Sequence, residues 1–197
     1  TCAEHGAVAP LHPPMVGSDE ALIQTAARSQ VPIWLPWPLP AGWLVSGLRY
    51  AGDEHSGPVA TVLALSGPNP IVLDADDVLS GDLLLVAEQP GVGLAAHLAG
   101  LQGIDPGAAL AAKASDAHLV VAGHATPMWS FAIGPQEVDA PDAGVAYVGE
   151  ALGEWLWVLA WPRPASAVLL QQFSLLDLRD PEHAYPLPFG ALTPRLS

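Results

Sequence analysis

The sequence predicts an α+β domain, with a mostly antiparallel sheet built from successive hairpins and a few short helices. Pairs of short apolar runs are separated by clusters of turn residues, which is typical of hairpins. Strands and long helices do not alternate regularly, as they would around a parallel sheet. With 197 residues and 51% hydrophobic content, the chain is long and apolar enough for one domain with its own core.

The chain divides into two predicted parts, an irregular, proline-rich segment over residues 1–17 and a single α+β domain over residues 18–197. The domain begins with a helix that we expect from Ser18 to Ser29. The hydroxyl of the first serine can accept a hydrogen bond from a free N–H group of the first turn. The two acidic residues that follow it suit the positive end of the helix dipole.

Residues 31–45, with the sequence VPIWLPWPLPAGWLV, form the most distinctive stretch of the chain. Proline fixes the backbone angle φ and lacks an N–H donor. This stretch is therefore expected to be a stiff extended arm and not a helix interior or a central strand. A Trp-Pro pair recurs in WPLPA at 37–41 and in WPRPA at 161–165. We interpret each pair as a corner at an edge of the sheet.

Three hairpins and one buried strand account for the rest of the predicted sheet. The buried strand covers residues 82–88, a mostly apolar run bounded by glycine and proline. The predicted hairpins join 43–51 to 59–66, 118–122 to 128–133 across GHATP, and 145–150 to 154–161 across ALG. Short helices broken by glycine are expected over 91–112, and a helix followed by a short strand is expected over 165–178.

The charge balance excludes two classes of partner. The chain has 6 basic and 20 acidic residues, for a net charge of −14. Such a surface repels nucleic-acid phosphates and anionic lipid headgroups, so neither nucleic acid nor a membrane surface is an expected partner. No apolar run approaches the roughly 20 residues that a membrane-spanning helix needs. The simplest role of the acidic residues is to keep an apolar-rich chain in solution.

Several common sequence motifs of catalysis are absent, which favours a non-catalytic protein over an enzyme. It has no G-x-S-x-G nucleophile motif and no phosphate-binding loop of the G-x-x-x-x-G-K-[ST] type. Gly91, Gly93 and Ala96 form a G-x-G-x-x-A pattern, but the βαβ context of a dinucleotide site is missing. The acidic loop over 74–82 lacks the glycine and the glutamate of an EF-hand.

Cys2 and His5 form a C-x-x-H pair, which is half of the ligand set of a tetrahedral zinc site. By spacing alone, the pair either completes a site with residues upstream of this chain or has no role with metal. Cys2 is the single cysteine, so no disulfide can form within the chain. A cytoplasmic location is therefore expected.

Four tryptophans are candidates for an interaction surface, because tryptophan is enriched at protein interfaces. They are Trp34, Trp37, Trp43 and Trp161. The alternative is that these rings anchor the arm and the Trp-Pro corners on the domain's own sheet. The sequence favours a non-catalytic binding or adaptor module that acts through protein–protein contacts. The alternative function is a small-molecule-binding protein or an unrecognised enzyme with its site near Gly91–Gly107.

Several stretches taken together resemble an uncharacterised actinobacterial protein family, a domain of unknown function. They include the N-terminal CAEHGAVAPL, the arm, LLLVAEQPGVGLAAHLAG, GEWLWVLAWP and the terminal LLDLRD and GALTPRL. The resemblance covers nearly the whole chain and implies a common fold and lineage but no activity. It also implies an upstream Cys-x-x-Cys pair that completes a zinc ribbon with Cys2 and His5. Residues 1–17 would then be the remnant of that ribbon, and this chain alone is expected to hold no cofactor.

Overall fold

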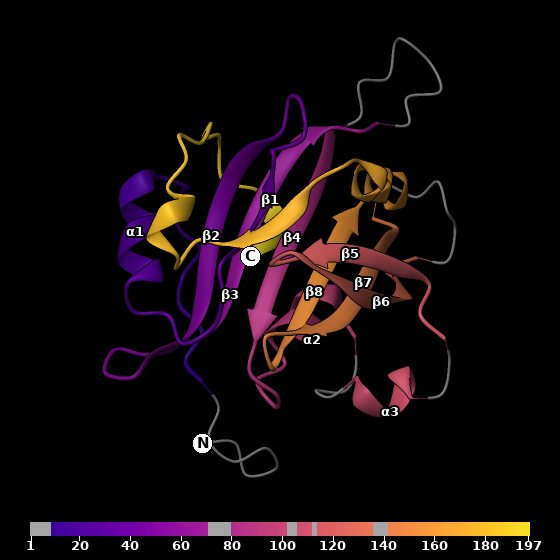
Figure 1. Cartoon of the computed structure of the whole chain (residues 1–197), viewed down its shortest axis with the longest axis horizontal. Helices are drawn as coiled ribbons and strands as arrows, with labels where there is room; N and C mark the ends of the chain where they lie inside the picture. Colours follow the sequence, from indigo (N-terminus) through magenta and orange to yellow (C-terminus); the bar gives the residue numbers. More distant parts are fainter. Residues whose placement is uncertain (1–8, 71–79, 102–105, 112–113, 136–141) are drawn as a thin grey trace.

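The computed structural model describes residues 9–70, 80–101, 106–111, 114–135 and 142–197 of the chain. Its main element is a nine-stranded sheet with the order β1-β9-β5-β6-β7-β8-β4-β3-β2 (Figure 1). All neighbouring strands are antiparallel except β5 and β9, which are parallel. The prediction of an α+β class with a mostly antiparallel sheet is thus confirmed in outline, although the described residues are mainly β.

The strands are β1 (Trp34–Trp37), β2 (Leu44–Asp53), β3 (Gly57–Pro68), β4 (Ser80–Glu88), β5 (Ala117–Val121), β6 (His124–Ile133), β7 (Gly144–Ala151), β8 (Glu154–Trp161) and β9 (Ser174–Asp177). The α-helices are α1 (Asp19–Ala26), α2 (Leu94–Ala99) and α3 (Gly107–Leu110). Three 3-10 helices complete the described elements: η1 (Arg163–Leu170), η2 (Pro181–His183) and η3 (Pro194–Leu196). No helix in this described part is both long and apolar enough to cross a membrane.

Apolar side chains lie on both faces of the curled sheet. One buried cluster, which includes Leu65, Leu85 and Leu175, lies between the long strands and the short strands β1 and β9. A second cluster lies on the other face, where α2 packs. Residues of β4 alternate between the two clusters, as Leu84 and Leu85 show. This alternation explains why the sequence of β4 is a continuous apolar run, and the predicted buried strand is confirmed.

The three predicted hairpins form, but one turn differs from the prediction. β5 and β6 are joined by Ala122 and Gly123 alone, with φ angles of 47° and 80°, and β6 begins directly after them. The predicted GHATP turn is therefore wrong at this position. β7 and β8 are joined in the same way by Leu152 and Gly153, with φ angles of 57° and 83°. Two successive residues with positive φ are the signature of the tight hairpin turn that matches the twist of the strands.

The arm forms β1, an edge strand that pairs only with β9 in the sheet. Proline at position 36 is compatible with this place because an edge strand can leave one row of hydrogen-bonding groups unpaired. The Trp-Pro corner at Trp37 therefore lies at a sheet edge, as predicted. The corner at Trp161 does not, because it ends β8, a central strand between β7 and β4. Both Trp-Pro peptide bonds are cis.

Segments from both ends of the chain cover the outer edge of β2. Met15 and Leu48 exchange two backbone hydrogen bonds of 2.8 and 3.0 Å. Val45 donates to the Pro188 carbonyl at 2.9 Å and accepts from the Gly190 N–H group at 2.9 Å. These bonds leave the edge strand little capacity to pair with another chain. They also show that the described residues of the predicted N-terminal segment, 9–17, pack on the sheet.

Trp43 fixes the end of the arm to the sheet. Gly67 on β3 and Gly81 on β4 are direct partners across the two strands. A Cβ atom on Gly67 would lie 2.5 Å from the Trp43 ring, and one on Gly81 would lie 3.3 Å from it. The two glycines thus form a flat surface that the buried indole covers, and Trp43 itself is only 3% exposed.

This contact predicts that Gly67→Ala destabilises the fold. The added methyl group must push a large, fully packed ring away, so the free energy of unfolding should fall by about 1–3 kcal/mol. Chemical denaturation measures the change. In a Trp43→Leu background the same substitution should cost less, because the smaller side chain leaves space. An equal cost in both backgrounds would show that the ring contact is not the reason for the glycine.

Candidate functional site

An apolar groove lies between α1 and residues 178–187, which follow β9. Its volume is about 590 Å³, the largest of four cavities that we compared among the described residues. The two walls come from opposite ends of the sequence and lie side by side in Figure 1, with α1 in indigo and the C-terminal wall in yellow. We call this cavity the α1 groove.

One wall of the groove is formed by an apolar stripe on α1 that is separate from the buried face of this helix. The Ser18 hydroxyl caps the helix by accepting a 3.1 Å hydrogen bond from the Ala21 N–H group. Leu22 and Thr25 are buried, as expected for the face of an amphipathic helix that packs on the domain. Ile23 points into the groove instead and is 66% exposed. Two alanines, at positions 26 and 27, continue this stripe one turn later.

The opposite wall is an irregular segment punctuated by prolines. Leu178, Pro181, Ala184, Pro186 and Leu187 give it an apolar surface. Its polar members are already engaged within the chain. The Asp180 side chain accepts a 3.0 Å hydrogen bond from the Glu182 N–H group, and the His183 Nδ1 atom lies 2.8 Å from the Asp177 carbonyl oxygen. A ligand in the groove would therefore make mainly apolar contacts with this wall.

Asp177, the last residue of β9, holds this wall in place. Its Oδ1 atom accepts hydrogen bonds from the N–H groups of Ile33 at 3.3 Å and Arg179 at 3.0 Å. Its Oδ2 atom forms an ion pair with the Arg179 guanidinium at 2.7 Å. The same guanidinium donates to the Gln30 carbonyl at 2.8 Å. These bonds join Ile33 of the arm, and Gln30 between α1 and the arm, to the C-terminal wall of the groove.

Stacked aromatic rings add a second connection between the arm and this wall. The rings of Trp37 and Tyr185 are 3.9 Å apart and nearly parallel, at 10°. The His183 ring lies 6.4 Å beyond Tyr185, at 18°. Stacking of this kind contributes about 0.5–1.5 kcal/mol beyond the buried area. The groove wall is therefore supported along its length.

The predicted interaction surface of four tryptophans is not a surface in the structure. Trp34, Trp43 and Trp161 are 1%, 3% and 6% exposed, so they belong to the core. Trp37 is half-buried and supports the groove wall through its stacked ring. The rings thus anchor the arm and the corners on the domain's own sheet, which was the alternative interpretation of these residues.

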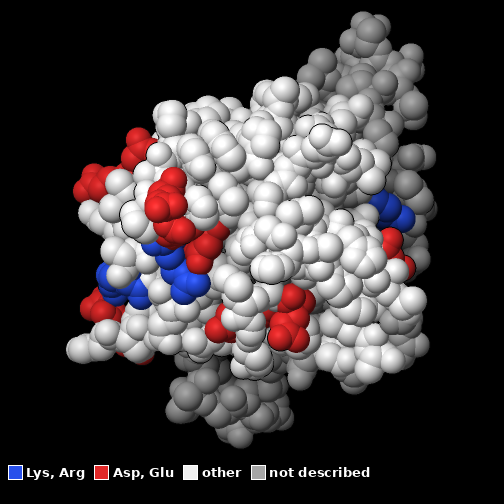
Figure 2. Space-filling view, viewed as in Figure 1, with Lys and Arg blue, Asp and Glu red and all other residues white. Residues whose placement is uncertain are grey.

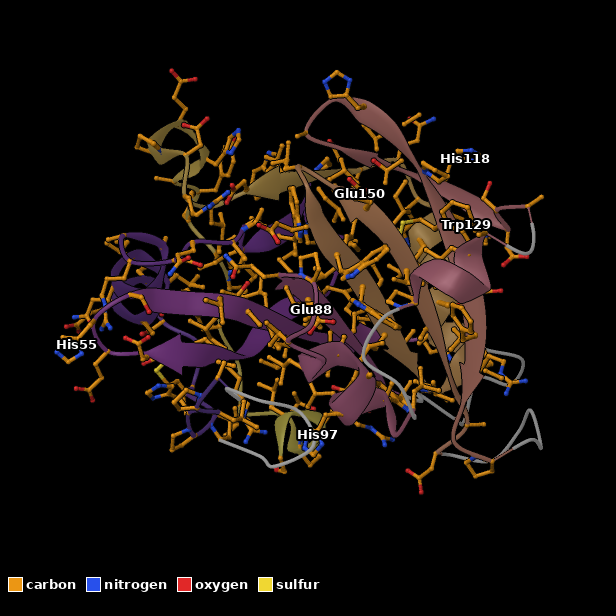
Figure 3. All side chains as sticks on the ribbon, turned by 90° about the horizontal axis from the view of Figure 1, so that it is seen from below. His55, Glu88, His97, His118, Trp129 and Glu150 are labelled. Atoms are coloured by element: carbon orange, nitrogen blue, oxygen red, sulfur yellow. The ribbon has the colours of Figure 1, made fainter. Side chains whose placement is uncertain are left out.

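The predicted zinc ligands Cys2 and His5 lie outside the described residues. Within the described residues, no group of three or more histidine, cysteine, aspartate or glutamate side chains is placed to hold a metal ion. Figure 3 shows that the labelled histidines His55, His97 and His118 lie far apart at the periphery.

Glu88 is a buried carboxyl group beside the region predicted for a small-molecule site. It is 0% exposed, and its Oε2 atom accepts hydrogen bonds from the N–H groups of Leu94 at 2.6 Å and Ala95 at 3.2 Å. These bonds fasten the start of α2 to the end of β4 (Figure 3). The other carboxyl oxygen has no hydrogen-bond partner among the described residues. Burial raises the pKa of Glu88 from 4.5 to about 7, although the two N–H groups favour its charged form.

The other three cavities do not lie at Gly91–Gly107. Cavities of about 430 and 560 Å³ adjoin at β5 and η1, where both are lined by His118, Leu119, Leu169 and Leu170. A smaller one, of about 220 Å³, lies on the other side of α1. The described residues of α2 are instead packed onto the sheet. The alternative hypothesis of a site near Gly91–Gly107 therefore gains no support from these cavities.

Comparisons with known proteins identify one family. A family model described as "Family of unknown function (DUF6758)" matches residues 1–196. No curated protein and no solved structure matches the chain. The groove must therefore be interpreted from its own geometry.

The role of Asp177 predicts that Asp177→Ala loosens one wall of the α1 groove. The substitution leaves the Ile33 N–H group and the Arg179 guanidinium without their acceptor, which should lower the free energy of unfolding by about 1–3 kcal/mol. Hydrogen exchange should become faster in residues 178–187. Asp53→Ala is the matched control, since Asp53 also accepts two backbone N–H groups, but in the β2–β3 turn. Unchanged exchange in 178–187 would contradict this role.

The raised pKa of Glu88 predicts how stability depends on pH. The folded state holds a proton on this carboxyl that the unfolded chain loses above about pH 4.5, so Glu88 lowers stability as the pH rises toward 7. Glu88→Gln removes the buried charge and keeps an acceptor for α2. It should therefore be more stable than the wild type at pH 8, by up to about 3 kcal/mol. At pH 4 the two proteins should be similar. If the difference in free energy of unfolding between the two proteins stayed constant from pH 4 to 8, the raised pKa of Glu88 would be ruled out.

Proposed function

Because the chain belongs to the DUF6758 family, whose function is unknown, we propose a role from the geometry of the α1 groove. The protein is a binding module that docks an apolar segment of a partner protein between α1 and residues 178–187. The observation that carries this proposal is the apolar cavity of about 590 Å³ with Ile23 exposed on its wall.

The chemistry of the walls favours a polypeptide over a small polar ligand. Sites for small molecules usually combine an apolar lining with a few free polar groups that orient the ligand. In the α1 groove, Arg179 and His183 already bond within the chain, and the exposed carboxylates of Asp19 and Asp180 lie at the start of α1 and the start of η2. What remains is a shaped apolar surface beside a helix, which is how proteins recognise the apolar face of a partner helix.

The adjoining cavities at β5 and η1 support a second candidate function, the binding of a small apolar molecule. Their shared residues Leu119 and Leu169 are part of, or pack against, the cluster inside the curled sheet. Leu170 is 87% exposed at the rim. We propose these cavities, in place of Gly91–Gly107, as the position of a small-molecule site.

A model peptide tests the first proposal. The probe is a fluorescein-labelled helix of about 18 residues, long enough to be helical in isolation, with leucine and alanine on one face and glutamine on the other. Ile23→Glu places a charge on the apolar wall and should weaken binding at least tenfold, or about 1.4 kcal/mol. Fluorescence anisotropy measures the dissociation constant.

Leu170→Glu is the matched control, because it introduces the same charge at the exposed rim of the β5–η1 cavities. It should bind the peptide like the wild type. Loss of binding in Leu170→Glu together with normal binding in Ile23→Glu would show that the peptide binds at the β5–η1 cavities and not in the α1 groove. No binding by the wild-type protein would end the proposal.

A further inference from the structure

Resting on the proposed function, we infer the chemistry of the partner: the α1 groove accepts an amphipathic helix whose apolar face is flanked by lysine or arginine. The inference combines the acidic rims of the groove with the small residues on α1.

Both rims of the groove carry exposed carboxylates. Asp19 lies at the start of α1, and Asp180 lies on the opposite wall. Glu182 is the exposed neighbour of Asp180 along the chain, whereas Glu20 lines the smaller cavity on the other side of α1. Figure 2 shows acidic side chains at the left of the molecule, with basic side chains directly beside them. Acidic groups on both sides of an apolar floor attract a cationic segment and steer its approach.

The basic groups near the groove are already neutralised or turned to other partners. Arg179 pairs with Asp177 and donates to the Gln30 carbonyl. Arg28, just after α1, donates to the Glu54 carbonyl at 3.0 Å. His183, the remaining titratable group on the lining, bonds through Nδ1 to the Asp177 carbonyl. With Arg179 paired to Asp177, Asp19 and Asp180 are the acidic side chains on the groove lining, and no unpaired arginine lies among its described residues.

The stripe on α1 has the spacing that helix-on-helix packing requires. Ile23, Ala26 and Ala27 are three and four residues apart, so they lie on one side of the helix. The two alanines leave a depression beside the isoleucine, into which side chains of a second helix can pack. The same stripe suits a cationic helix better than an anionic lipid surface, because carboxylates on both rims repel lipid headgroups.

Three peptides with the same apolar face and different flanks test the inference. The flanks are lysine, glutamine or glutamate. At low salt the lysine peptide should bind roughly tenfold more tightly than the glutamine peptide, and the glutamate peptide more weakly than both. The preference should largely disappear at about 0.5 M salt, where exposed charges are screened. Anisotropy titrations with the full chain measure all three.

The double variant Asp19→Asn, Asp180→Asn removes the two carboxylates that line the groove, and asparagine at position 180 can still cap η2. It should lower the preference for lysine, measured as the ratio of the dissociation constants of the glutamine and lysine peptides. Glu150→Gln, an exposed carboxylate on β7 (Figure 3), is the matched control and should change neither.

The outcomes separate the two proposals. Equal binding of the lysine and glutamine peptides by the wild type overturns the inference and leaves the proposed docking groove intact. A lysine preference that survives the double variant also overturns it, because the charge would act elsewhere. Failure of all three peptides to bind overturns the proposed function itself.

Discussion

The carboxylate of Asp177 is the interaction on which the α1 groove depends. It ends β9, accepts hydrogen bonds from Ile33 and Arg179, and through the Arg179 guanidinium reaches the Gln30 carbonyl. The arm begins at Val31, shortly after α1 ends at Ala26, so these bonds tie the chain that follows the helix to the C-terminal wall. The Nε and Nη2 atoms of Arg179 both contact the Oδ2 atom of Asp177, at 2.9 and 2.7 Å, and hydrogen bonds between charged groups are stronger than neutral ones. The Asp177 side chain thus connects the segment that follows α1 to the C-terminal wall and helps to fix the two walls of the groove.

The aromatic rings of the arm pack within the domain, whereas the composition of the arm suggested an exposed interaction surface. Its rings do not form an exposed surface, because Trp34 and Trp43 are core residues. Trp43 lies over Gly67 and Gly81, and Trp37 stacks on Tyr185. Only Trp34–Trp37 runs along β9, as an edge strand that tolerates Pro36, and the arm then turns, with the Trp43 N–H group donating to the Pro40 carbonyl. Composition indicates large apolar rings on a stiff segment but does not reveal which surface they cover.

Local patterns predicted much of the sheet. The paired runs around each turn identified three hairpins, and the apolar run of β4 identified a strand buried on both faces. The position of the β5–β6 turn was missed because alanine precedes glycine there, and alanine rarely adopts positive φ. The α1 groove could not be predicted, because its walls are about 150 residues apart in sequence and meet only through tertiary bonds. An exposed isoleucine beside buried positions of α1 was its one local signal.

We propose that the groove between α1 and residues 178–187 is the binding surface of the protein. A map of backbone amide chemical shifts in the full chain, as the glutamine-flanked peptide is added, tests this most directly. The perturbed amides should cluster in residues 19–27 and 178–187. Perturbations confined to residues 117–120 and 169–173, around the β5–η1 cavities, would contradict it.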